Sequence, residues 1–330
     1  MAENVVDQLF SNLRQSMPEC TAVRLVGHTP KSEYYLYEAV LEFPEKQERI
    51  SAKIYRAKGK ESSKAQARRE YENLLEVQQA FEKRKITGAP MPLGDFSELG
   101  AVITLKVPGL PLQSIIMKAA LLPGYADHKG LRKSATAAGE WLRSFHKTLA
   151  QGAIVLDTAA VLKDLQAVAK ACKREGLEDG DMQLILSGAE QSLAKATKTT
   201  AASAVLHEFT PLNISLCDGR VFLCDYSGME ATGMALLDVG HFMAAIEALE
   251  KYPFCNREIT SSMQEDFLAG YGVTASDRAV VRVLKMRELL RMFAAGRNVK
   301  DAAVRKKVMW ANVMKKFIHE AANRTLSQAA

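Results

Sequence analysis

Three polar side chains in the second half of the chain have the chemistry of a metal-dependent reaction. They are Glu208, Asn213 and Asp225. The amide of Asn213 and the carboxylate of Asp225 offer oxygen ligands, which suit a hard cation such as Mg²⁺ that keeps its other positions for phosphate. Glu208 precedes Asn213 by five residues and could accept a proton from an attacking hydroxyl. Together these residue types predict a site for phosphoryl transfer.

A predicted β-hairpin connects two of these side chains. Two short apolar runs, residues 214–217 and 221–224, are separated by Asp218-Gly219. This dipeptide supplies the positive φ angles of a tight hairpin turn. Asn213 precedes the first run and Asp225 follows the second. Folding of the hairpin is therefore expected to place Asn213 beside Asp225.

The first half of the chain contributes a cation and a carboxylate. Lys53 lies on a predicted strand, residues 49–55, in which it points away from the face that carries the alternating apolar residues. A helix is predicted over residues 62–81, and it contains Glu70. By themselves, a lone strand lysine and a glutamate beside two arginines are most often solvated surface residues.

The sequence LHEFTPLN at residues 206–213 resembles the catalytic segment of the aminoglycoside phosphotransferase and choline kinase-like family, where members often have HGDFTPxN. The FTP triplet and Asn213 match, and Asp225 after the hairpin matches the metal-binding aspartate. The family's catalytic Asp is replaced by Glu208. Two alignments are open. Either Glu208 holds the catalytic position and His207 stands where the family has Gly, or His207 is the His of the motif and one residue has been lost.

The resemblance implies a protein kinase-like fold and a reaction that uses ATP and Mg²⁺. In that fold a strand lysine contacts the α- and β-phosphates and pairs with a helix glutamate, which assigns these roles to Lys53 and Glu70. The sequence KVPGLPL at residues 106–112 is similar to the family's hinge. The resemblance therefore implies that backbone groups near Leu105 and Val107 bind the edge of the adenine.

These elements together predict an α+β, bilobal, kinase-like fold. A small lobe, residues 1–107, is expected to contain a five-stranded antiparallel sheet and one main helix. A mostly helical lobe, residues 108–330, is expected to carry the hairpin. The apolar periodicity of residues 130–149 predicts a core-facing helix, in which His146 is expected to be structural. Asp238 could cap a helix, and the resemblance implies that it braces the catalytic segment.

Composition limits the class of protein. The chain has 330 residues, of which 48% are hydrophobic, which is enough for two sizeable cores. No apolar run approaches the roughly 20 residues that cross a bilayer, and the N-terminal sequence does not resemble a signal peptide. Five cysteines without metal-type spacing indicate reduced thiols. These features predict a cytoplasmic protein.

Positive charge is concentrated near the end of the chain. Residues 278–324 contain thirteen Lys and Arg against three Asp and Glu, a local net charge of +10. Most such runs form solvated helix faces, although they also attract anionic partners. Aromatic residues do not alternate with the basic ones, so nucleic acid is not an expected partner. The charge disfavours a polycationic acceptor and allows an anionic one.

Two functions follow from the sequence. The first is an ATP- and Mg²⁺-dependent phosphotransferase that acts on a hydroxyl of a small molecule. The alternative is a catalytically weak or inactive relative that binds nucleotide or a partner. The alternative arises because Glu208 is one methylene longer than the Asp it replaces, and a displacement of about 1 Å at a reacting centre can cost about 100-fold in rate.

Overall fold

The computed structural model describes residues 2–56, 59–122, 127–252, 255–297, 313 and 315–323. The chain divides into two compact units. Unit 1 comprises Met1–Gly109 and Ser215–Met229, and unit 2 comprises Leu110–Ile214 and Glu230–Ala330. The first stretch of unit 1 therefore ends at Gly109, two residues after the boundary expected at residue 107. The segment that carries the hairpin groups with unit 1 rather than with the helical part.

Unit 1 is built on a five-stranded sheet with the strand order β1-β2-β3-β5-β4. All of its neighbouring strands are antiparallel, as the sequence predicts. Its elements before the hairpin are α1 (Ala2–Ser16), β1 (Ala22–Pro30), β2 (Tyr34–Glu42), β3 (Gln47–Tyr55), α2 (Lys60–Arg84), β4 (Pro92–Phe96), η1 (Ser97–Leu99) and β5 (Ala101–Leu105).

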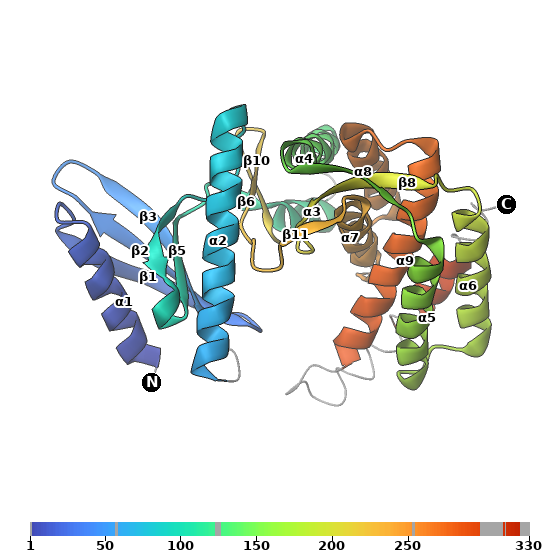
Figure 1. Cartoon of the computed structure of the whole chain (residues 1–330), viewed down its shortest axis with the longest axis horizontal. Coiled ribbons are helices and arrows are strands. Elements are labelled where there is room, and N and C mark those ends of the chain that lie inside the picture. The colour runs from blue at the N-terminus through green and yellow to red at the C-terminus, as the bar shows by residue number, and fades with distance from the viewer. Residues whose placement is uncertain are drawn as a thin grey trace. The chain divides into compact units, whose positions relative to one another are not determined.

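The two faces of this sheet differ in what they bury. One face packs apolar side chains such as Ile50 and Ala52 of β3 against Leu9 and Leu13 of α1. Alternation along β3 directs Lys53 to the opposite face. Helix α2 contacts strands β3, β4 and β5 and lies across the sheet from α1 (Figure 1). An ammonium buried on that side needs a charged partner.

The hairpin of strands β9 (Ile214–Cys217) and β10 (Arg220–Leu223) forms as predicted. Asp218 has φ 50 and Gly219 has φ 74, the left-handed conformations that a tight turn between two strands requires. The amide of Leu223 donates to the carbonyl of Gly88 at 2.9 Å. This bond attaches the end of β10 to the loop that precedes β4.

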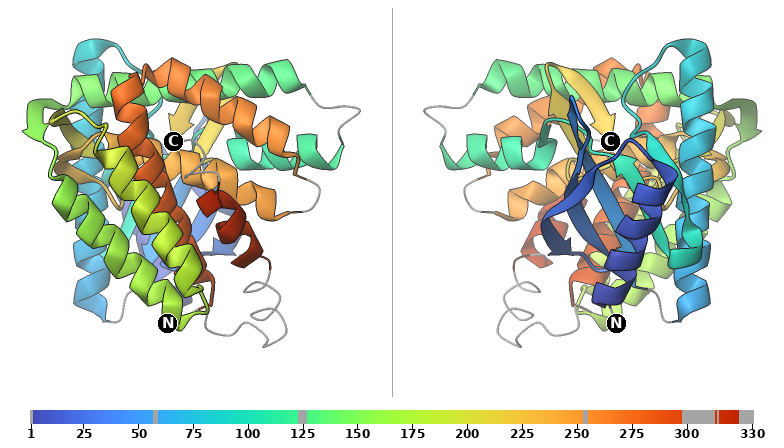
Figure 2. Two further views of the ribbon diagram at one scale, coloured as in Figure 1. Left: turned by 90° about the vertical axis from the view of Figure 1, so that its right-hand side faces the viewer. Right: turned by 90° about the vertical axis from the view of Figure 1, so that its left-hand side faces the viewer.

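Unit 2 is mostly helical and contains a three-stranded antiparallel sheet with the order β11-β8-β7. Helices α5, α6 and α9 pack side by side (Figure 2). The elements are β6 (Leu110–Pro111), α3 (Leu112–Leu121), α4 (His128–Thr148), β7 (Ala150–Val155), α5 (Thr158–Arg174), α6 (Asp179–Leu193), β8 (Thr199–Val205), β11 (Glu230–Met234), α7 (Leu236–Glu247), η3 (Ala248–Lys251), α8 (Arg257–Tyr271) and α9 (Ala275–Arg297). Residues 315–323 are also helical. The predicted α+β fold class is confirmed.

The basic C-terminal region is only partly described. Helix α9 contains its first part, whereas residues 298–312, 314 and 324 lie outside the described residues. Among the helices that the structure describes, none combines the length and the apolar character that crossing a bilayer would require.

Candidate active site

Lys53 lies at the centre of a buried charge cluster in unit 1. Its Nζ is 2.5 Å from Oε1 of Glu70 and 3.2 Å from Oδ1 of Asp225. The side chains of Lys53, Glu70 and Asp225 are only 11%, 2% and 7% exposed. The structure thus brings together the strand lysine, the helix glutamate and the carboxylate that follows the hairpin.

Opposite charges offset the cost of burial in this cluster. Burial alone would lower the pKa of Lys53, but Asp225 and Glu70 together outweigh it and raise that pKa well above its ordinary value. Burial raises the pKa of Glu70, and the charge of Lys53 opposes this shift. Burial would also raise the pKa of Asp225, but Lys53 and the donors of Ser227 lower it. Two carboxylates therefore face one ammonium. The cluster has a net negative charge, which would attract a further cation.

Helix α2 holds both Glu70 and the segment after the hairpin. The hydroxyl of Tyr55 donates to Oε2 of Glu70 at 2.6 Å, and the amide of Tyr226 donates to Oε1 at 3.4 Å. One turn further along α2, the side-chain amide of Asn73 donates to the carbonyl of Tyr226 at 2.9 Å. These contacts fix the main chain next to Asp225. The sequence analysis did not identify Tyr55 or Asn73.

Asp225 has donors on both carboxylate oxygens. The amide and hydroxyl of Ser227 donate to Oδ1 at 2.9 and 2.6 Å. The hydroxyl of Tyr34 donates to Oδ2 at 3.3 Å, and the ring of Tyr34 lies 5.1 Å from Nζ of Lys53. Tyr34 was not predicted to belong to the site. A cation that binds Oδ2 would compete with this hydroxyl.

In unit 2, Asp238 braces the segment that precedes Glu208. Its side chain is fully buried and accepts hydrogen bonds from the amides of Leu206 and His207, both at 2.8 Å. His146 contacts the same carboxylate at 3.0 Å through Nε2 and the hydroxyl of Tyr271 at 2.9 Å through Nδ1. Asp238 thus braces this loop, as the resemblance implied, and His146 is structural, as expected. Asp238 does not cap α7, because the N-cap of that helix is residue 235.

The main chain turns sharply at the candidate base. His207 adopts φ 59, a left-handed conformation that favours glycine. Glu208 is exposed, whereas Phe209 is fully buried and stacks on Trp141 with ring centroids 5.7 Å apart. The buried ring and the brace at Asp238 therefore anchor the segment from either side of Glu208. A left-handed residue directly before Glu208 favours the alignment in which Glu208 holds the catalytic position.

Asn213 is oriented by the same turn. Its Nδ2 donates to the carbonyl of Glu208 at 3.1 Å and lies 3.5 Å from Oε2 of Glu208. Both contacts are made by the amide nitrogen. The amide oxygen, Oδ1, accepts no hydrogen bond from the described residues. A carbonyl oxygen in that position can serve as a ligand for a hard cation. Asn213 and Glu208 belong to unit 2 and Asp225 to unit 1, so the expected approach of Asn213 to Asp225 stays a prediction.

The expected adenine-binding segment follows β5. The amide of Leu105 donates to the carbonyl of Met91 at 2.8 Å. The expectation that backbone groups near Leu105 and Val107 bind the edge of the adenine stays a prediction. Gly109 has φ +92, and a Cβ there would lie 2.0 Å from the carbonyl oxygen of Leu216. Only glycine permits this close approach between the segment and the hairpin.

Three comparisons with known proteins were informative to different degrees, and only the solved structures resemble this chain. No family model matches the sequence, and no curated protein matches it. Among solved structures, an ADP-bound aminoglycoside phosphotransferase is 13% identical, with 95% of this chain and 98% of that chain covered and a TM-score of 0.54. Amicoumacin kinase in complex with AMP-PNP and Ca²⁺ is 13% identical, with 90% and 88% covered and a TM-score of 0.55. Choline kinase LicA from Streptococcus pneumoniae is 14% identical, with 96% and 99% covered and a TM-score of 0.52.

These proteins share their fold with the chain over nearly its whole length. The protein kinase-like fold that the motif resemblance implied is therefore confirmed. At this level of identity the likeness establishes the fold alone. The activity has to be argued from the residues themselves.

Proposed function

We propose that the protein is an ATP- and Mg²⁺-dependent phosphotransferase that acts on a hydroxyl of a small molecule. The observation that carries this proposal is the buried cluster of Lys53, Glu70 and Asp225. A buried ion pair contributes little net stability compared with apolar residues of similar volume. Three charged groups held at one place by α2, β3 and the hairpin are better explained by a ligand that they bind.

The roles of the unit 1 residues follow from their contacts. Lys53 would bind the phosphates through its ammonium, which the raised pKa keeps charged. Glu70 would position that ammonium, because its own oxygens are fixed by Tyr55 and Tyr226. Backbone groups near Leu105 and Val107 would bind the edge of the adenine.

The residues present fit a magnesium ion. The lowered pKa of Asp225 keeps its carboxylate ionised, and Asn213 presents an amide oxygen. Hard oxygen donors of this kind are the protein ligands that Mg²⁺ accepts. Bound magnesium would offset the negative charge of the transferring phosphoryl group. We assign Asp225 and Asn213 as its protein ligands.

Glu208 is assigned to the acceptor. It is exposed, it follows a braced and left-handed residue, and its carboxylate can accept the proton of an attacking hydroxyl. The side chain of Glu208 is one methylene longer than that of the Asp it replaces. It fits this role if the tight turn at residues 207–213 moves the main chain away from the acceptor by a similar distance. Positioning and metal charge supply most of the catalysis in phosphoryl transfer, so loss of this base would reduce turnover without abolishing it.

Magnesium-dependent ADP release tests the proposal. A panel of hydroxylated metabolites serves as acceptors for the wild type, Asp225→Ala, Glu208→Ala and the control Glu48→Ala, which removes a half-buried carboxylate of unit 1 that pairs with Lys46. We expect Asp225→Ala to lower turnover by at least about 100-fold and Glu208→Ala by about 100-fold, with the control unchanged. Turnover that survives Asp225→Ala at the level of the control would contradict the proposal.

A second candidate function is nucleotide binding without turnover. Two observations favour it: Glu208 replaces the catalytic Asp, and the hydroxyl of Tyr34 contacts Asp225 at 3.3 Å. This candidate predicts that nucleotide raises the melting temperature while no acceptor supports ADP release. Turnover with any acceptor that depends on Asp225 would exclude it.

A further inference from the structure

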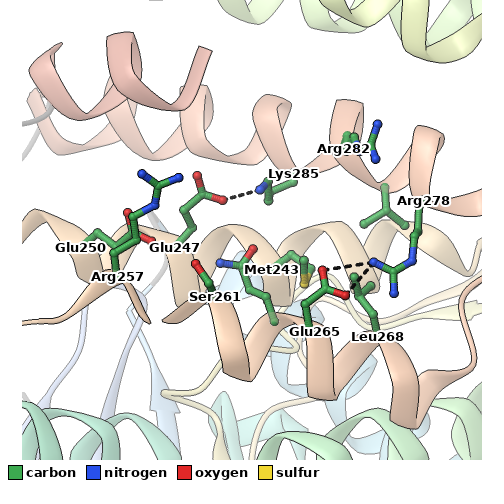
Figure 3. Close-up of a pocket in the computed structure, with 12 residues that line it drawn as sticks. Met243, Glu247, Glu250, Arg257, Ser261, Glu265, Leu268, Arg278, Arg282 and Lys285 are labelled. Atoms are coloured by element: carbon green, nitrogen blue, oxygen red, sulfur yellow. Dashed lines mark hydrogen bonds and ion pairs between the residues drawn. The ribbon is translucent and has the colours of Figure 1, made fainter. Parts of the chain in front are cut away.

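A cavity in unit 2 has no part in the roles assigned above. It has a volume of about 320 Å³ and lies among α7, η3, α8 and α9 (Figure 3). On α8, the lining residues Arg257, Ser261 and Gln264 are spaced four and three residues apart, so they lie on the same side of the helix. A volume of this size is at the lower end of the range for small-molecule sites.

The lining of this cavity has an excess of positive charge. Its charged side chains are four cations, Arg257, Arg278, Arg282 and Lys285, and three carboxylates, Glu247, Glu250 and Glu265. Two of the carboxylates are neutralised locally, because Glu247 pairs with Lys285, and Glu265 accepts two bonds from Arg278 at 2.8 and 3.1 Å (Figure 3). Glu250 accepts the hydroxyl of Thr260 at 2.7 Å. The net charge of the lining is therefore +1.

Arg257 provides a cation that is available to a ligand. It is the first residue of α8, directly after Asn256, whose side chain caps the helix by accepting the amide of Glu258 at 2.8 Å. The guanidinium of Arg257 makes no ion pair with any residue that the structure describes. The positive end of the α8 dipole lies at the same place and favours an anion there.

Gln264 offers a ligand a second polar group in the cavity. It lines the cavity two turns after Arg257 and is only 7% exposed. Within the described part of the chain its side-chain amide has no hydrogen-bond partner. Neither polar atom of this amide is among the fully buried atoms that lack a partner, so both are accessible from the cavity. A polar ligand that reaches Gln264 would satisfy it.

We propose that this cavity binds a small hydroxylated anion, of the class of sugar phosphates and sugar acids. The phosphate or carboxylate contacts Arg257 at the N-terminus of α8. The hydroxyl groups of the ligand exchange hydrogen bonds with Gln264 and Ser261 and donate to Glu250. A neutral or cationic sugar lacks the first of these contacts. The site lies wholly within unit 2, and ligand binding there does not require phosphotransferase activity.

Titration calorimetry of the full chain at low ionic strength tests this assignment. The probes are glucose 6-phosphate and gluconate, which distinguish a phosphate from a carboxylate, and glucosamine as a cationic sugar. The variants are Arg257→Gln, which removes the charge, and Gln264→Leu, which removes the amide at similar volume. Arg174→Gln removes an exposed arginine from the last turn of α5 and is the matched control.

We expect at least one of the two anions to bind the wild type, and glucosamine to bind at least about tenfold more weakly. Arg257→Gln and Gln264→Leu should each weaken binding by about tenfold, whereas Arg174→Gln should leave it unchanged. Melting curves establish that each variant is folded, and either cavity variant alone suffices if the other does not fold. The proposal is overturned if neither anion binds the wild type at about 10 mM, if glucosamine binds as tightly, or if the folded cavity variants match the control.

Discussion

Replacing Lys53 by Met removes the only cation from the described part of the charge cluster in unit 1. Methionine keeps most of the apolar stem that packs on the sheet, so the substitution isolates the effect of the charge. Glu70 and Asp225 remain, with side chains 2% and 7% exposed. Both carboxylates are then buried without a neutralising partner.

The expected loss follows from this burial. Removing one partner of a buried ion pair costs about 3–5 kcal/mol, because the other partner is left as an uncompensated charge. We expect Lys53→Met to lower the free energy of unfolding by about 4 kcal/mol near pH 7.5. The control Lys46→Met breaks the pair of Lys46 with Glu48 at the surface, where the lysine side chain is 62% exposed. A surface pair contributes about 0–1 kcal/mol, so its loss should be small.

The loss should shrink as the pH falls. In the wild type, the lowered pKa of Asp225 stabilises the fold above the unfolded pKa, and this contribution disappears as pH falls through the folded pKa. Glu70, whose pKa is raised, contributes in the opposite sense. In Lys53→Met the pKa of both carboxyls rises above the unfolded values. The folded variant then binds more protons than the unfolded chain, and its stability increases relative to the wild type towards about pH 4–5.

Urea unfolding followed by circular dichroism measures this prediction at pH 7.5 and pH 5. A loss that is largest at pH 7.5 and smaller at pH 5 agrees with two buried carboxylates held by one ammonium. A loss below about 1 kcal/mol, equal to that of Lys46→Met at both pH values, would refute the buried cluster.

Three further substitutions test other parts of the account. Tyr34→Phe removes the hydroxyl that contacts Asp225. We expect a Mg²⁺-nucleotide to bind this variant about fivefold more tightly by calorimetry, because one hydrogen bond contributes about 1 kcal/mol. Unchanged affinity would show that the hydroxyl does not compete with the metal. Phe209→Ala empties the aromatic stack on Trp141 and should destabilise the protein by about 3–5 kcal/mol in urea, so a value near zero would exclude Phe209 as an anchor. His207→Gly relieves the left-handed conformation and should raise stability by about 0.5–1 kcal/mol, whereas a loss would mean that the imidazole contributes more than the backbone costs.

Local sequence rules were sufficient to predict the elements that position the site. Alternation along β3 predicted that Lys53 faces away from the apolar core of the sheet, and the turn at Asp218-Gly219 forms with the positive φ angles that this dipeptide favours. The resemblance at residues 206–213 and at Glu70 then supplied the pairing of Lys53 with Glu70. Pairing across distant segments follows no local periodicity, so the motif was needed for it.

The residues that the sequence did not reveal act through contacts between distant segments. Tyr34 lies at the start of β2 and contacts Asp225, which follows the last strand of the hairpin. Asn73 lies one turn after Glu70 and binds the carbonyl of Tyr226. A tyrosine on a strand and an asparagine on a helix are common surface residues. Only the folded arrangement of unit 1 distinguishes them from other residues of the same types.

The most direct test of the central claim is the effect of Mg²⁺ on nucleotide affinity. Calorimetry with a non-hydrolysable ATP analogue, with and without Mg²⁺, is carried out on the wild type and on Asp225→Ala. We expect Mg²⁺ to tighten binding to the wild type by about tenfold or more and to have no effect on Asp225→Ala. An analogue that fails to bind, or one that binds both proteins equally with and without Mg²⁺, would contradict the assignment of Lys53 and Asp225 to a metal–nucleotide site.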